Sequence, residues 1–136
     1  MDAFDADVLI YAAVADHHLG RRVRPLLAGT RPAGVGSLLL LPELLSKPWR
    51  DRALAELTEL AGLLARLELR PVDRATADLA VALGAQHRLH AADAVHLATA
   101  MVAGADRFIT NNRKDFTRAI TGIEVVYPQD LPAPAR

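Results

Sequence analysis

Five acidic side chains stand at positions where carboxylates could do chemistry together. Asp5 and Asp7 interrupt the apolar run AFDADVLI, and Glu43 interrupts LLLLPELL. Asp93 lies in HAADAVHLATA, and Asp115 follows the apolar segment RFIT in TNNRKDF. A buried carboxylate without a partner is costly, and a bound cation is the usual remedy. Such oxygen ligands suit Mg²⁺ or Mn²⁺, which can activate water and neutralise charge developing on a phosphate. The predicted chemistry is phosphodiester hydrolysis.

Alternating strands and helices are expected to position these side chains. Apolar patterns predict strands at residues 3–10, near Val35, and at 67–72, 107–110 and 123–128. Helical spacing predicts helices at residues 11–20, 21–27, 37–46, 51–66, 73–84 and 91–103, with Ser37 and Asp73 as caps and Gly20 and Gly104 as stops. Pro42 should kink the third helix or delay its start. The pattern predicts a three-layer α/β/α sandwich around a mostly parallel sheet of four to five strands.

The topology explains how acidic residues so distant in sequence can meet. In an open α/β sheet, ligands bind at the carboxyl ends of the strands. Each of the five acidic residues lies near such an end or in a segment that can reach it. Asp5 and Asp7 are two residues apart, so within the predicted strand their side chains should point the same way and share one cation.

Composition indicates an ordinary globular domain. The chain has 136 residues and no cysteine, so we expect one domain over 1–136, with a loose proline-rich tail at about 128–136, and no disulfide or thiolate metal site. No stretch reaches the roughly 20 apolar residues that cross a bilayer, and the amino terminus lacks the basic residues of a signal peptide. A cytoplasmic protein without membrane contact is expected. The formal net charge of zero argues against sequence-blind attraction to nucleic acid but does not exclude RNA as a substrate.

Each acidic residue also has a structural interpretation. Asp5 and Asp7 could be a chance pair in a loop, and a lone glutamate on a helix, such as Glu43, is usually solvated. Asp93 could serve only to stabilise a helix amino terminus. Asp115, with the preceding asparagines, could simply form a turn.

Histidine spacing does not predict a zinc site. The five histidines show no HExxH or comparable arrangement. His17 and His18 are expected on the surface, and His87, His90 and His96 are expected to be structural or solvated. His96 lies one helical turn after Asp93 and could meet a substrate.

Three segments resemble the motifs of the PIN-domain family, and of its VapC-type toxins in particular. FDADVLIYA is similar to the first motif, and SLLLLPELLSKP to the second. The most specific match is RLHAADAVHLATAMVAGADRFITNNRKDF, in which an aspartate opens an alanine-rich helix and a strand then leads into T-N-N-x-x-D-F. The resemblance covers nearly the whole chain and keeps the order of the motifs.

The resemblance implies a metal-dependent ribonuclease. Four residues match the family's acidic positions and would hold Mg²⁺ or Mn²⁺ and support catalysis: Asp5, Glu43, Asp93 and Asp115. Asn112 matches a polar position and is a possible accessory residue. Asp7 stands where serine, threonine or asparagine is commoner, so it would alter metal number or preference, and Pro42 would change how Glu43 is presented.

The resemblance also implies partners. It predicts an RNA substrate, a homodimer, and inhibition by a small VapB-type antitoxin encoded nearby. Arg113 and Lys114, beside the last motif aspartate, are the expected contacts with the scissile strand.

Two other functions remain open from the sequence. A haloacid-dehalogenase-like phosphohydrolase also begins with an apolar strand and D-x-D, although Val8 and Leu9 stand here in place of its Gly-Thr and the chain is short for that fold. A catalytically silent PIN-like binding module is the second alternative.

Overall fold

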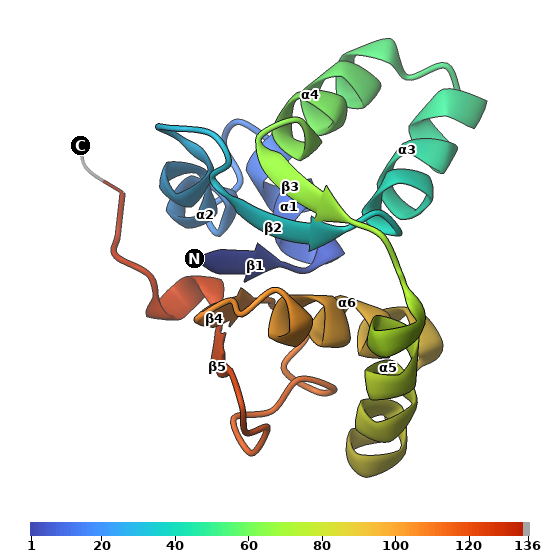
Figure 1. The fold of residues 1–136 in the computed structure, drawn as a ribbon. Coiled ribbons are helices and arrows are strands. Elements are labelled where there is room, and N and C mark those ends of the chain that lie inside the picture. Colours follow the sequence, from blue (N-terminus) through green and yellow to red (C-terminus); the bar gives the residue numbers. More distant parts are fainter. Residues whose placement is uncertain (135–136) are drawn as a thin grey trace.

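A computed structural model describes residues 1–134 and contains one parallel β-sheet (Figure 1). Its strands lie in the order β3-β2-β1-β4-β5, and every neighbouring pair is parallel. The strands are β1 (Asp2–Phe4), β2 (Gly34–Ser37), β3 (Leu67–Arg70), β4 (Arg107–Ile109) and β5 (Glu124–Val126). The predicted three-layer sandwich with a central parallel sheet is confirmed.

Helices cover both faces of the sheet (Figure 1). One face carries α1 (Ala6–Ala13), α2 (Gly20–Leu27), α3 (Leu40–Arg50) and α4 (Leu54–Leu64), and the other carries α5 (Arg74–His87) and α6 (Ala91–Val102). Successive strand residues point to opposite faces. Ala3 and Phe108 therefore join the core beneath α5 and α6, whereas Phe4 and Ile109 join the core beneath α1 to α4. Two apolar layers thus fix the sheet from both sides.

The predicted strand over residues 3–10 is wrong in its second half. β1 ends at Phe4, and Asp5 is the N-cap of α1, with its side chain accepting a hydrogen bond from the Ala6 backbone N–H. Aspartate favours both the N-cap and the first turn of a helix, and Asp7 lies in that first turn. Asp5 and Asp7 therefore do not share one side of a strand.

The predicted helix ending at Gly20 is also wrong. α1 ends at Ala13, and Gly20 begins α2 instead of terminating a helix. A Cβ atom at Gly20 would lie 2.0 Å from the backbone oxygen of Tyr11. Glycine is needed here because α2 passes directly against the backbone of α1.

Other helix boundaries shift by a few residues. Ser37 is the last residue of β2 and accepts a hydrogen bond from the Leu39 backbone N–H, so α3 begins only at Leu40. Pro42 consequently lies in the first turn, where its missing N–H breaks no helical bond.

The helix predicted from residue 51 begins at Leu54, and the one predicted to stop near residue 84 continues to His87. The caps at Asp73 and Gly104 agree with prediction, since Asp73 accepts from the Thr76 backbone N–H and Gly104 has φ +73°.

The carboxyl-terminal segment is more ordered than expected. Pro128–Asp130 form a 3₁₀ helix, η1, and Leu131 is 3% exposed within the core beneath α1 to α4. The predicted loose tail is therefore wrong over residues 128–131. Residues 135–136, which that prediction also included, lie outside the described part of the chain.

The helices in the described part of the chain are all too short or too polar to cross a bilayer.

Two glycines provide a matched test of this packing. Gly20→Ala should lower the free energy of unfolding by about 1–3 kcal/mol because the added methyl group collides with the backbone at Tyr11. Gly62→Ala should raise it by about 0.5–1 kcal/mol, since Gly62 lies inside α4 with no atom within 4 Å of an added Cβ. Urea unfolding of both variants measures the difference. Equal effects of the two substitutions would contradict the close approach of α1 and α2.

Candidate metal centre

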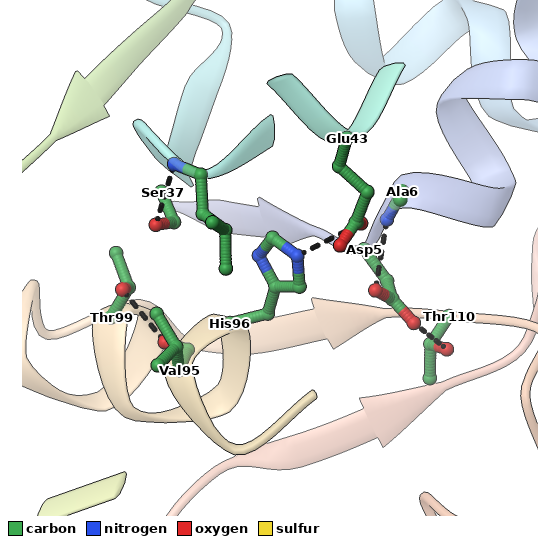
Figure 2. Close-up of polar contacts among 9 residues, drawn as sticks. Asp5, Ala6, Ser37, Glu43, Val95, His96, Thr99 and Thr110 are labelled. Atoms are coloured by element: carbon green, nitrogen blue, oxygen red, sulfur yellow. Dashed lines mark hydrogen bonds and ion pairs between the residues drawn. The ribbon is translucent and has the colours of Figure 1, made fainter. Parts of the chain in front are cut away.

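Asp5 lies at the centre of the candidate site, where β1 and β4 end side by side. Its backbone N–H donates to the Ile109 oxygen at 3.0 Å, which continues the pairing of the two strands. The side chain is almost completely buried, and one carboxylate oxygen accepts from the Ala6 backbone N–H at 2.8 Å while the other accepts from Thr110 Oγ1 at 2.7 Å (Figure 2). The carboxylate is thus held in one orientation by two neighbouring segments.

Asp7 brings a second carboxylate to the same place. Its Oδ2 accepts a hydrogen bond from the Asn111 backbone N–H at 3.0 Å, in the loop that follows β4. Its Oδ1 is buried and has no hydrogen-bond partner among the described residues. Burial, and to a smaller extent the negative charge of Asp5, raise the pKa of Asp7 to about 7. A buried oxygen left without a partner is what a carboxylate awaiting a cation would show.

Asp93 and Asp115 complete the acidic cluster. Asp93 lies in the first turn of α6, and the loop residue Asp115 accepts a hydrogen bond through Oδ2 from Asn112 Nδ2 at 3.0 Å. Burial and the charges of Asp5 and Asp115 raise the pKa of Asp93. Burial likewise raises the pKa of Asp5, with a smaller contribution from Glu43, against the opposing effects of Thr110 and His96. The carboxylates are therefore close enough to repel one another.

Glu43 reaches the cluster from α3, on the opposite side from α6. Its Oε1 lies 3.1 Å from Nε2 of His96, a buried residue of α6 (Figure 2). Burial by itself lowers the pKa of His96, but the hydrogen bond to Glu43 and the charges of Asp5, Glu43 and Asp93 outweigh burial and raise it. Pro42 does not displace Glu43, whose backbone N–H donates to the Leu39 oxygen. The five predicted acidic side chains therefore converge at one edge of the sheet.

Sequence comparison identifies the family to which this arrangement belongs. A sequence model of the PIN domain matches residues 3–120. The chain belongs to the PIN domain family. No curated protein sequence matches it.

Solved structures show the same fold as this PIN domain. A chain of a toxin-antitoxin complex from Klebsiella pneumoniae is 26% identical, with 94% of this chain and 98% of that chain covered and a TM-score of 0.74. VapBC2 from Rickettsia felis, bound to a DNA fragment from its promoter, is 16% identical over 93% and 97% of the two chains, with a TM-score of 0.71. DNA-bound VapBC from Salmonella typhimurium is 22% identical over 93% and 97%, with a TM-score of 0.68.

The donor set of this PIN domain fits a divalent cation. One ligand atom from each of His90, Asp93 and Asp115 lies within 4.8 Å of the other two. The unpartnered Oδ1 of Asp7 and the mutual repulsion of Asp5 and Asp93 are further reasons for positive charge at this position. Hard oxygen ligands predominate, as Mg²⁺ and Mn²⁺ sites require.

Three residues of the site were not among the predicted ones. Thr110 orients Asp5, His96 pairs with Glu43, and His90 borders Asp93. The sequence indicated His96, one helical turn after Asp93, as a possible substrate contact, whereas His90 was expected only to be structural or solvated. His90 lies three residues before Asp93, and this equal spacing is the signal that could have found it. The only sequence feature that indicated Thr110 was its position at the end of a predicted strand.

Arg113 is exposed, and its side chain already has contacts within the protein. Its guanidinium donates to Gln129 Oε1 at 3.0 Å and lies 4.6 Å from the centre of the Tyr127 ring. Tyr127 in turn donates from its hydroxyl group to the Phe116 oxygen at 2.7 Å. Arg113 thus links the loop that carries Asp115 to the carboxyl-terminal segment. Both Arg113 and Lys114 are exposed, and their contact with RNA stays a prediction.

The pKa of Asp7 predicts how the metal-free protein responds to pH. Its pKa of about 7 in the folded state lies above the ordinary aspartate value of 3.8. Ionisation of Asp7 therefore destabilises the fold, and this effect is absent at low pH and complete above pH 7. Between pH 5 and 8 in chelator, the wild type should lose stability relative to Asp7→Asn by at most about 3 kcal/mol. Urea unfolding at the two pH values measures this difference.

Asp78→Asn is the matched control, because it removes an exposed carboxylate on α5 that pairs with Arg74. This variant should keep the pH dependence of the wild type. A parallel pH dependence of the wild type and Asp7→Asn would contradict the raised pKa.

Proposed function

We propose that this chain is a Mg²⁺- or Mn²⁺-dependent endoribonuclease and the toxin of a VapBC-type toxin-antitoxin pair. The observation that carries the proposal is the convergence of five carboxylates from four separate segments at the carboxyl edge of the sheet, with one oxygen of Asp7 buried and unpartnered. Membership of the PIN domain family, whose members are generally nucleases, supports phosphodiester hydrolysis as the reaction.

The carboxylates divide into holding and orienting groups. Asp5, Asp93 and Asp115 would hold the principal cation, and Asp7 would supply a further oxygen. When bound, a divalent cation supplies activation of water and stabilisation of the charge that develops on the phosphate. Asp5 needs no rearrangement for this role, because Ala6 and Thr110 already fix its carboxylate. In-line attack would leave a 5′-phosphate and a 3′-hydroxyl.

Glu43 has the geometry of an orienting residue. The buried imidazole of His96 contacts one of its oxygens at 3.1 Å, which leaves the other oxygen available to the cluster. Glu43 would use that oxygen to bind the cation or to orient the attacking water. The exposed ammonium group of Lys114, one residue before Asp115, would contact the RNA strand.

Partners follow from the solved relatives. The similar chain from Klebsiella pneumoniae was solved in a toxin-antitoxin complex, and this supports a small antitoxin as the regulator of the present chain. A homodimer is also proposed, and light scattering should then give a mass of twice 14.7 kDa. A mass of one chain at micromolar concentration would contradict the dimer.

RNA cleavage provides the direct test of the function. Purified protein should cut a mixed RNA pool in Mg²⁺ or Mn²⁺ but not in chelator. Asp5→Asn and Asp93→Asn should each reduce the rate at least about 100-fold, because each removes a cation ligand. The new RNA ends should carry 5′-phosphates, which a phosphate-dependent exonuclease detects.

Asp78→Asn serves as the control, since it changes an acidic residue outside the cluster and should cleave like the wild type. Asp5→Asn that retained full metal-dependent cleavage would contradict the assignment. Hydrolysis of small phosphoesters without RNA cleavage would favour a phosphohydrolase, and the absence of both activities would favour a silent binding module.

A further inference from the structure

His90 occupies an unusual position at the edge of the acidic cluster. It is the N-cap residue of α6, with φ −64° and ψ 159°, yet its side chain makes no capping hydrogen bond. Serine, threonine, aspartate and asparagine are the residues that stabilise an N-cap. Histidine at this place therefore contributes little to the start of the helix, and its side chain is available for another role.

Helix geometry turns His90 toward Asp93. The two residues are the N-cap and the third residue of α6, positions close enough that in a capping box each side chain reaches the backbone N–H of the other residue. Asp115 approaches from the loop after β4. One ring nitrogen of His90 and one oxygen from each aspartate all lie within 4.8 Å of one another. Donors on opposite sides of one ion lie about 4–5 Å apart, given metal-ligand distances of about 2.0–2.6 Å, so a single ion can contact all three.

We propose that His90 is a ligand of the divalent cation and that it shifts the preference of the site toward Mn²⁺ over Mg²⁺. This proposal rests on the proposed metal-dependent function and adds a nitrogen donor to its oxygen set. Imidazole suits transition metals, whereas Mg²⁺ favours oxygen ligands and retains its water. Asp93 and Asp115 keep the site suitable for Mn²⁺, which accepts both donor types.

Pulsed electron paramagnetic resonance of Mn²⁺ tests this assignment without an activity assay. Mn²⁺ alone is added to purified protein from which any histidine tag has been removed. The wild type should show modulation from a directly bound ¹⁴N nucleus. His90→Ser should abolish this modulation and lower Mn²⁺ affinity about 10- to 100-fold, with a smaller effect on Mg²⁺ affinity in competition titrations.

The variants separate ligation from folding. Serine is a favoured N-cap residue without nitrogen in its side chain, so His90→Ser should preserve α6, and circular dichroism verifies this. His90→Ala is a second variant and should give the same loss of modulation. His18→Ala is the matched control, since His18 is exposed and stacks on the His17 ring 5.1 Å away, and it should retain the wild-type signal.

Failure of the inference and failure of the proposed function give different results. Tight Mn²⁺ binding without ¹⁴N modulation, or modulation that persists in His90→Ser, would overturn the role of His90 while leaving the acidic site in place. Wild-type Mn²⁺ binding as weak as that of Asp93→Asn would overturn the metal site and, with it, the role of His90.

Discussion

Electrostatic repulsion among buried carboxylates is the constraint around which this PIN domain is arranged. Asp5 is almost completely buried, Asp7 and Asp93 are partly buried, and burial with neighbouring negative charge raises the pKa of each. An apolar interior would exclude such a cluster. The fold tolerates it because polar groups orient the individual carboxylates, and because Asp5 and Asp93 lie at helix amino termini, where the helix dipole favours negative charge.

The remaining architecture supplies the rigidity that the cluster needs. The consecutive residues Phe108 and Ile109 of β4 pack into the two apolar cores on opposite faces of the sheet. This packing fixes the position of Thr110 beside Asp5. α3 and α6 approach from opposite faces of the sheet and meet through the contact between Glu43 and His96. The carboxyl-terminal segment holds the loop of Asp115 through Arg113 and Tyr127. Distant parts of the chain thus fix one small volume.

The sequence predicted the architecture and the convergence of the acidic residues, since both follow from periodic patterns. Alternation of strands and helices implies a parallel sheet, and the carboxyl-end rule then brings the acidic residues together. The boundary at Asp5 was not predictable from hydrophobicity alone. The apolar pattern of residues 3–10 fits a buried strand and a buried helix equally well. Only the preference of aspartate for a helix N-cap distinguishes the two.

Side-chain partners were harder to predict because tertiary contacts decide them. The pairing of Glu43 with His96 spans 53 residues, and that of Asp5 with Thr110 spans 105, so no local pattern indicates them. The contacts of Arg113 were equally hidden from local patterns, since its guanidinium lies over the Tyr127 ring and donates to Gln129. Gln129 comes from the segment predicted as a loose tail and Tyr127 from the last predicted strand, so no local pattern indicated either contact.

Anomalous diffraction from crystals soaked in Mn²⁺ would show directly whether the carboxylate cluster binds a divalent cation. We expect a strong anomalous peak in contact with Asp5, Asp93 and Asp115, and no such peak in crystals of Asp93→Asn prepared in the same way. A cluster without a peak, in crystals that bind Mn²⁺ elsewhere, would show that no cation binds there and would leave the buried carboxylates without their proposed counter-charge.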